Sequence, residues 1–126
     1  MWRYTNHSLI RQVLNLKSIR RENIFGLVES GGILFAASDS YGIAIYNRDQ
    51  WQEVQFADSS LNMTTLGIAI TYRGTPCFGT MDGSIVFYRD HLWNRIPLGE
   101  GPVTFLASDG KSLFAWTDGQ LVAITF

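Results

Sequence analysis

One pattern recurs along the chain about every 40 residues, and internal repetition of this kind restricts the possible folds more than any other feature of the sequence. Three five-residue stretches begin with Phe, continue with a small residue and end with Asp. They are Phe35-Ala36-Ala37-Ser38-Asp39, Phe78-Gly79-Thr80-Met81-Asp82 and Phe114-Ala115-Trp116-Thr117-Asp118. Their starts lie 43 residues apart (35 to 78) and 36 residues apart (78 to 114).

The flanking residues repeat as well. A glycine-containing turn precedes each stretch, and a second turn followed by an apolar run comes after each Asp. Another apolar run lies ahead of each copy, at 24–28, 66–70 and 103–107. The first two copies end on similar stretches, Trp51-Gln52-Glu53-Val54 and Trp93-Asn94-Arg95-Ile96. Each copy thus has up to four short runs bounded by turn residues, which predicts antiparallel strands joined by hairpins.

The character of these runs predicts how the strands are layered. The third run of each copy is apolar at consecutive positions, which indicates burial on both faces of a sheet. The fourth run is more polar and suits an exposed outer strand. Four-stranded units of about 40 residues are the period of β-propellers. We therefore predict an all-β protein, a β-propeller with about three four-stranded antiparallel blades per chain.

The copies resemble the two-component-regulator type of propeller repeat. In that type a Gly-aliphatic-x-x-Tyr run is followed by a short turn and a Trp, as in Gly42-Ile43-Ala44-Ile45-Tyr46 and then Trp51. The resemblance covers nearly the whole chain. It implies a propeller fold, and its short motifs imply no particular activity.

The repeat also predicts the boundaries of the blades. Residues 24–56 and 64–98 are expected to form whole blades, and 101–126 the three inner strands of another. Residues 8–14 match a fourth strand, although the spacing of their apolar residues is also partly compatible with a helix over 8–23. The total is twelve strands. Trp2-Arg3-Tyr4-Thr5 either extends the fourth strand or caps a sheet edge.

Three blades do not close a ring, since propellers have about four to eight. If each open face covers on the order of 500 Å², burying it contributes about 12 kcal/mol at roughly 25 cal/mol per Å². That is comparable to the net stability of a domain, about 5–15 kcal/mol. We expect a head-to-tail homodimer of six blades, in which two mixed blades each take the fourth strand from one chain and three strands from the other. The alternative is a different partner chain that supplies the missing blades.

Composition excludes several classes of partner. The net charge is −1, so we expect neither nucleic acid nor an anionic membrane as a partner. The local basic cluster of Lys17, Arg20 and Arg21 reads as a solvated loop. No apolar stretch approaches the roughly 18 residues of a membrane span. The N-terminal residues lack the apolar stretch of a secretory signal, so we do not expect export by that route. Localisation stays open, consistent with cytoplasmic synthesis or with a virion or other assembly component.

No pattern predicts catalysis, a cofactor or a metal site. The recurring Asp39, Asp82 and Asp118 suit turns better than a calcium or catalytic ring, because one carboxylate per blade makes no oxygen cage. Cys77 is the only cysteine and lies in an apolar run, as a buried small residue would. His7 and His91 fall in turns without a second ligand nearby.

Four aromatic residues are candidates for ligand binding. Trp51 and Trp93 are equivalent and could act as sugar platforms, or they could pack the outer strands onto neighbouring blades. Tyr41 and Trp116 depart from the repeat, where a scaffold tends to place specific contacts. We expect a non-enzymatic scaffold or interaction subunit that oligomerises, such as a part of a virion or secretion machine. The alternative is a carbohydrate-binding, lectin-like propeller.

Overall fold

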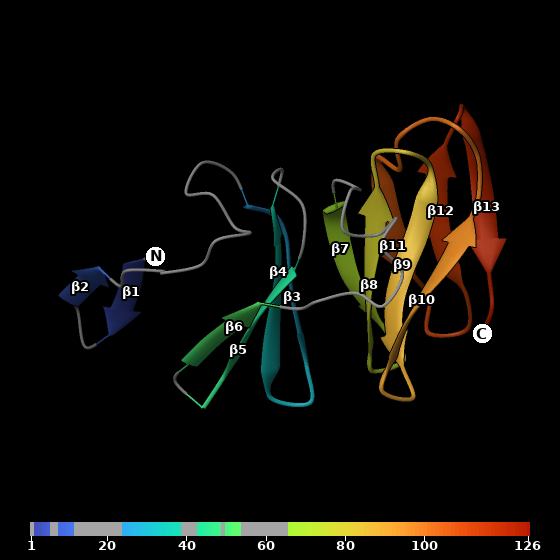
Figure 1. The fold of residues 1–126 in the computed structure, drawn as a ribbon. Coiled ribbons are helices and arrows are strands. Elements are labelled where there is room, and N and C mark those ends of the chain that lie inside the picture. The colour runs from blue at the N-terminus through green and yellow to red at the C-terminus, as the bar shows by residue number, and fades with distance from the viewer. Residues whose placement is uncertain (1, 6–7, 12–23, 39–42, 49, 54–65) are drawn as a thin grey trace.

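The protein's computed structural model describes residues 2–5, 8–11, 24–38, 43–48, 50–53 and 66–126. Every regular element in this part of the chain is a β-strand (Figure 1). The strands are β1 Trp2–Thr5, β2 Ser8–Arg11, β3 Ile24–Ser30, β4 Ile33–Ser38, β5 Ile43–Asn47, β6 Gln50–Glu53, β7 Leu66–Tyr72, β8 Thr75–Thr80, β9 Ser84–Arg89, β10 Leu92–Pro97, β11 Phe105–Ser108, β12 Leu113–Thr117 and β13 Gln120–Ile124. The prediction of an all-β fold is confirmed.

Each strand pairs with its neighbour in the sequence, and all pairs are antiparallel. Sheet 1 has the order β3-β4-β5-β6, sheet 2 the order β7-β8-β9-β10, and sheet 3 the order β11-β12-β13. The strands β1 and β2 form a separate two-stranded N-terminal hairpin. Meanders of this kind need only short connections, which the many turn residues of the sequence supply.

The tight turns explain why these residues form hairpins. Two-residue hairpin turns of type I′ require a positive φ at both central residues. Gly31-Gly32, Arg73-Gly74, Asp90-His91 and Asp118-Gly119 all meet this requirement, with φ between 49° and 80°. Gly adopts this conformation without strain, and Asp and His tolerate it better than bulkier residues do. The backbone of these turns thus matches the twist of the strands that they join.

The three sheets are stacked face to face in chain order, with sheet 2 in the middle (Figure 1). Their first strands adjoin one another, β3 beside β7 and β7 beside β11. Gly26 of β3 has the carbonyl oxygen of Gly67 and the Cβ of Ala69 where its own Cβ would be, so only glycine lets β3 and β7 approach this closely.

Two apolar clusters hold the stack together. Between sheets 1 and 2 the buried residues are Val28, Phe35, Ala37, Ile43, Phe78 and Val86. Between sheets 2 and 3 they are Tyr72, Cys77, Ile85, Phe87, Val103, Leu106, Leu113 and Ala115. Sheet 2 therefore buries both of its faces, as the consecutive apolar residues of β9 predict.

The strand registers correct the sequence alignment of the three Phe-containing stretches. The β3–β4 turn closes on the pair Ser30–Ile33 and the β7–β8 turn on Tyr72–Thr75, so Phe35 corresponds to Cys77. Phe78 lies one position further along and faces sheet 1, whereas Phe35 faces sheet 2. A shift of one residue moves a side chain to the opposite face of a strand. Because sheet 2 is apolar on both faces, its sequence does not reveal the shift.

The N-terminal hairpin changes the predicted strand count. Trp2–Thr5 forms β1, so the described residues contain thirteen strands and not the predicted twelve. The strand β2 covers the first four residues of the predicted 8–14, and residues 12–14 lie outside the described part. The register pairs Trp2 with Arg11 and Thr5 with Ser8. These residues therefore form neither the start of a helix over 8–23 nor an extension of a fourth strand.

Candidate functional site

Sheet 3 has one face packed against sheet 2 and one face open. Leu106, Leu113 and Ala115 point toward sheet 2 and are buried. Side chains alternate along strands, so the registers assign the remaining residues to the open side. We call this side the outer face of sheet 3, and it consists of Phe105, Ala107, Phe114, Trp116, Leu121 and Ala123.

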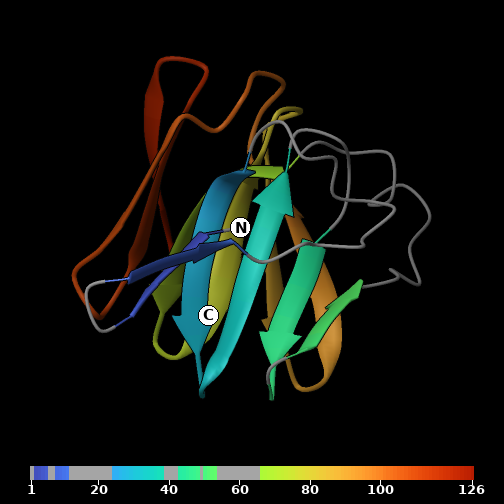
Figure 2. The same ribbon diagram turned by 90° about the vertical axis from the view of Figure 1, so that its left-hand side faces the viewer.

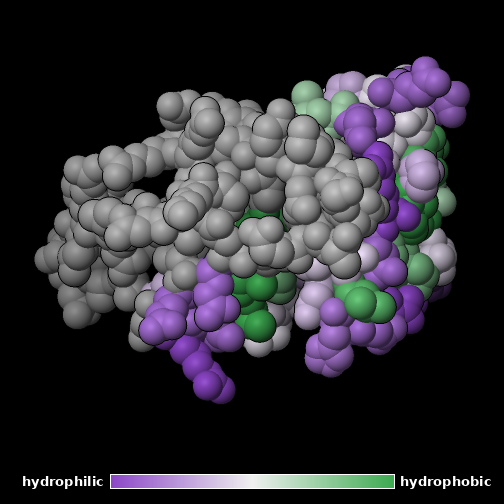
Figure 3. Space-filling view, viewed as in Figure 1, coloured by the Kyte–Doolittle hydropathy of each residue, from purple (hydrophilic) through white to green (hydrophobic). Residues whose placement is uncertain are grey.

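The outer face is entirely apolar, and three of its four large residues are exposed. Phe105, Trp116 and Leu121 lie opposite one another in a single row across the three strands. Their exposed fractions are 53%, 44% and 60%. Hydrophobic residues are visible along the edge of the molecule that sheet 3 forms (Figure 3). A row of contiguous exposed apolar residues indicates a surface for interaction, which singly scattered residues do not.

The connector over residues 98–104 orients sheet 3 on sheet 2. The Val103 amide donates to the carbonyl oxygen of Thr80 over 3.0 Å, and the Val103 side chain is buried between the sheets. The next amide, of Thr104, donates to the carbonyl oxygen of Trp116 over 3.1 Å. Two adjacent residues thus join the ends of β8 and β12, which sets the direction in which the outer face points.

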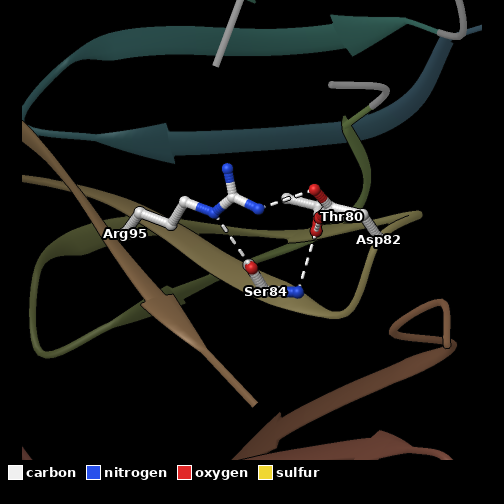
Figure 4. A network of polar contacts seen from close by, with 4 residues as sticks. All are labelled: Thr80, Asp82, Ser84 and Arg95. Atoms are coloured by element: carbon white, nitrogen blue, oxygen red, sulfur yellow. Dashed lines mark hydrogen bonds and ion pairs between the residues drawn. The ribbon is translucent and has the colours of Figure 1, made fainter. Parts of the chain in front are cut away.

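A polar network braces the β8–β9 turn on the sheet 2 side of this connector (Figure 4). The Arg95 guanidinium donates to the Asp82 carboxylate over 2.6 Å and to Ser84 Oγ over 3.0 Å. The Thr80 hydroxyl donates to the other Asp82 oxygen and accepts from the Ser84 amide over 2.9 Å. The network joins β10 to the turn and leaves the Asp82 carboxylate paired.

A similar arrangement braces the β12–β13 turn. The Asp118 carboxylate accepts from the Glu100 amide over 2.7 Å, and the Thr117 hydroxyl donates to the Gly101 carbonyl oxygen over 2.8 Å. Side chains at Gly99 or Gly101 would collide with the Asp118 carboxylate, which is why the connector is glycine-rich here. Asp82 and Asp118 therefore bind turn and connector groups, and Asp39 lies outside the described residues.

The four aromatic candidates differ in their surroundings. Trp93 is half-buried between sheets 1 and 2, with its ring 5.1 Å from Tyr88, 6.2 Å from Phe35 and 6.1 Å from Phe78. Trp116 is on the outer face. Trp51 pairs with Tyr46 in the β5–β6 register, and its side chain lies outside what the structure describes, as does Tyr41.

The residues that sequence reasoning missed are Phe105 and Leu121. Side chains alternate between the two faces of a strand, and this alternation places Phe105 of β11 and Leu121 of β13 on the same face as Trp116. The sequence alone does not show which residues of the run 103–107 face the core, because β11 is only four residues long. The strand register is needed to decide this.

Cys77 is buried in the cluster between sheets 2 and 3. Burial raises the pKa of the Cys77 thiol to about 12, so that group stays protonated. His91 is exposed in the β9–β10 turn, and His7 lies outside the described residues. In the described ranges, no three His, Cys, Asp or Glu side chains are placed to hold a metal ion.

A second surface with apolar residues lies at the other end of the stack. We call it the far face of sheet 1, the side turned away from sheet 2, and it includes Leu27, Glu29, Leu34, Ala36, Ala44 and Tyr46. Leu27 is 56% exposed, whereas Ala36 and Ala44 are buried. The two ends of the stack are therefore unlike. The outer face of sheet 3 is apolar with three large exposed side chains, whereas the far face of sheet 1 carries Glu29 and, among its described residues, exposes one large apolar side chain, Leu27.

No helix in the described part of the chain is long and apolar enough to span a membrane. The chain matches no protein-family model, and no curated protein matches it.

Proposed function

We propose that the protein is a non-enzymatic β-propeller subunit that assembles head to tail with a second copy. In this assembly the outer face of sheet 3 of one copy packs against the far face of sheet 1 of the other. The proposal rests on one observation above all, the fully apolar outer face with Phe105, Trp116 and Leu121 exposed in a row. Two copies with three blades each give a ring of six, within the usual range.

The stacking within the chain supports the propeller part of the proposal. Consecutive meanders of four, four and three strands lie face to face with their first strands adjoining, as blades do around an axis. The resemblance of the repeats to the two-component-regulator type agrees with this arrangement. The sheet 1–sheet 2 and sheet 2–sheet 3 contacts show that the chain already stacks apolar sheet faces on one another.

The head-to-tail geometry follows from the difference between the two end surfaces. Within the chain, sheet 2 turns one side toward sheet 1, and sheet 3 turns the equivalent side toward sheet 2. A sheet that continues the stack beyond sheet 3 must turn this same side toward sheet 3. The far face of sheet 1 is that side. A head-to-tail assembly forms a closed ring only when the rotations between successive copies add up to a full turn. In a dimer, two identical contacts of this kind form together.

The mass in solution tests this proposal. Light scattering after gel filtration should give twice the chain mass of 14.2 kDa. Trp116→Glu places a charge in the middle of the outer face and should return the mass to that of one chain. Leu92→Glu is the matched control, because Leu92 is 64% exposed but lies on β10 away from the outer face. An unmodified chain that stays monomeric at tens of micromolar contradicts the proposal.

The same measurement separates the two ways of closing the ring. A homodimer gives twice the chain mass without any addition. Closure by a different chain leaves the purified protein monomeric, and the proposal of a homodimer is then wrong. With either way of closing the ring, we propose that the protein serves as a structural part of a larger assembly, such as a virion or secretion machine.

A second candidate function, carbohydrate binding, is favoured by the exposure of Trp116 beside Phe105. Exposed aromatic rings can stack on the apolar side of a sugar ring, and these two rings lie on adjacent strands. A glycan array with the unmodified protein and Trp116→Ala tests this function. Binding to no glycan removes it, and binding that is unchanged in Trp116→Ala removes this site.

A further inference from the structure

The outer edge of sheet 3 is a strand with free backbone groups. The β12–β13 turn is of type I′ and closes on the pair Thr117–Gln120, which is therefore hydrogen-bonded. Hydrogen-bonded and non-hydrogen-bonded pairs alternate along an antiparallel ladder. The amide and carbonyl groups of Leu121 and Ala123 consequently point away from β12, toward an edge that pairs with no other described strand.

This edge differs from the outer edges of the other two sheets. Natural edge strands are protected from pairing by charged side chains, proline or bulges. The outer strand β6 of sheet 1 contains Glu53, and β10 of sheet 2 contains Arg95 and Pro97. The strand β13, Gln-Leu-Val-Ala-Ile, contains no charge and no proline, and its register has no bulge. Its edge is therefore suited to accept a further strand.

The N-terminal hairpin also has an unpaired strand edge. A two-stranded hairpin alone is at best marginally stable in water, and β1 and β2 join no other described sheet. Because Asn6 and His7 separate the pair Thr5–Ser8, the same alternation directs the amides of Leu9 and Arg11 to the free edge of β2. The hairpin thus has an open edge of its own.

The position of the hairpin determines which β13 it can reach. The hairpin lies on the side of sheet 1 opposite to sheet 2, in front of β3 in the view of Figure 2 (Figures 1 and 2). The strand β13 of the same chain lies at the other end of the stack. A second copy docked on the far face of sheet 1 brings its sheet 3 to the side where the hairpin lies. Because first strands adjoin in this stack, the hairpin must then move from β3 toward the β6 side to reach the partner's β13.

We propose that two copies exchange hairpins, with β2 of each copy pairing antiparallel to β13 of the other. The inference rests on the proposed head-to-tail assembly and adds a backbone junction to its side-chain contact. Sheets 1 and 2 have an antiparallel fourth strand at the equivalent edge, β6 beside β5 and β10 beside β9. The exchanged hairpin fills that place on sheet 3, and β1 lies outside it as a fifth strand.

Proline substitutions test the junction without disturbing the ladders inside the chain. Ala123→Pro and Leu9→Pro each remove an amide that points to a free edge, where proline is tolerated. Each variant alone loses both junctions of its homodimer, and we expect its dissociation constant to rise about tenfold or more in analytical ultracentrifugation. The controls Ala123→Ser and Leu9→Ala change the same side chains but keep the amides. Each proline variant is compared with the control at its own position, and the additional loss of affinity measures the backbone junction.

Mixing the two proline variants gives the decisive result. A dimer of one Ala123→Pro chain and one Leu9→Pro chain retains one intact junction, between the unmodified β2 and the unmodified β13. We therefore expect the mixture to associate more tightly than either variant alone. Pairing of β13 with a second β13 predicts instead that Leu9→Pro has no effect, and that result overturns the inference.

The outcomes also separate this inference from the proposed function. If Trp116→Glu abolishes the dimer while both proline variants dimerise normally, the sheet faces dock and the hairpins are not exchanged. If the unmodified chain is monomeric, the proposed function and the inference both fail. If the proline variants lose dimerisation and their mixture does not recover it, the hairpin and β13 do not meet each other and the inference fails.

Discussion

Gly79 lies on β8 where sheet 2 meets the connector that leads into sheet 3, and no side chain fits there. A Cβ at this position would lie 2.7 Å from Val103 Cγ1 and 2.9 Å from Ile68 Cγ2. Both distances are shorter than carbon atoms tolerate, and both neighbours are themselves packed between the sheets. At the scale of single residues, stability therefore depends on space as much as on hydrophobicity.

The variant Gly79→Ala should lower the free energy of unfolding by about 1–3 kcal/mol, because Val103 and Ile68 have to move. Urea unfolding followed by tryptophan fluorescence measures the change. Gly67→Ala is the matched control, since its Cβ meets only the Gly79 carbonyl oxygen at 3.7 Å, an ordinary contact. An equal loss in both variants would show that backbone flexibility, and not the contact with Val103, is responsible.

Cys77 leads to a prediction about pH. Burial raises the pKa of its thiol from 9.0 to about 12, so the folded state keeps the proton longer than the unfolded state does. The corresponding stability is fully present below pH 9 and decreases as pH rises from 9 toward 12. We expect iodoacetamide at pH 8 to modify Cys77 only after urea unfolds the protein. Rapid modification of the folded protein, seen by mass spectrometry, would contradict this.

At the scale of elements, the turns and the connector determine how strands become a stack. Type I′ turns fix the registers within each sheet, and hydrogen bonds from residues 98–104 fix sheet 3 on sheet 2. The Thr117 hydroxyl is fully enclosed and donates to Gly101, so it links the β12–β13 turn to the connector. This link orients sheet 3 without adding apolar contact area.

The variant Thr117→Val keeps the shape of the side chain and removes the donor to Gly101. We expect a loss of about 1 kcal/mol in the free energy of unfolding, because the carbonyl oxygen loses its partner. Thr117→Ser keeps the hydroxyl and should retain the hydrogen bond, although it loses a buried methyl group. Comparing the amide hydrogen exchange of Glu100 and Thr104 in the two variants distinguishes the lost hydrogen bond from lost packing.

The elements could be predicted from the sequence, and their registers could not. The turns and apolar runs placed the strands of sheets 1 and 2 because Gly, Asp and Ser mark hairpins strongly. The one-residue offset between Phe35 and Phe78 remained hidden, since both residues are buried on one face or the other. The sequence of residues 2–5 does not distinguish a strand from an edge cap, because both have the same short pattern of aromatic and polar residues.

The candidate site could be predicted only in part, for a related reason. Trp116 stood out as a departure from the repeat, but its neighbours Phe105 and Leu121 become recognisable only when the strands are paired. Trp93 matched Trp51 in the sequence, yet the ring of Trp93 packs against Tyr88 and Phe35. Exposure depends on what lies beyond each face of a sheet, and the strand pattern contains no information about that.

At the scale of the whole molecule, both ends of the stack expose large apolar side chains, although not to the same extent. The outer face of sheet 3 exposes three large side chains, and the far face of sheet 1 exposes Leu27. Fully burying such side chains contributes about 1.5–3 kcal/mol each. Since these side chains are already about half-buried, side-chain burial alone gives a modest association, and a backbone junction would strengthen it.

Burial of the end surfaces on association predicts that thermal stability depends on protein concentration. If dimerisation covers the end surfaces, the midpoint of thermal unfolding should rise when the protein is concentrated from about 1 μM to 100 μM. Differential scanning fluorimetry over that series measures the shift. Trp116→Glu should unfold at a midpoint that does not change with concentration. A concentration dependence that is the same in Trp116→Glu would show that another surface mediates the association.

The two end surfaces of the stack are unlike each other, and that asymmetry governs what happens when a ring fails to close. Each copy added head to tail leaves one fresh surface of each kind, so growth has no built-in stop other than the return of the last sheet to the first. A substitution near Gly26, for example, could change the tilt between neighbouring sheets by a few degrees. The residues of the two end surfaces would stay the same, but the last sheet would no longer meet the first and the ring would not close. In the proposed assembly, such a variant would polymerise into open filaments, visible by electron microscopy, in place of the closed dimer that we propose for the unmodified protein.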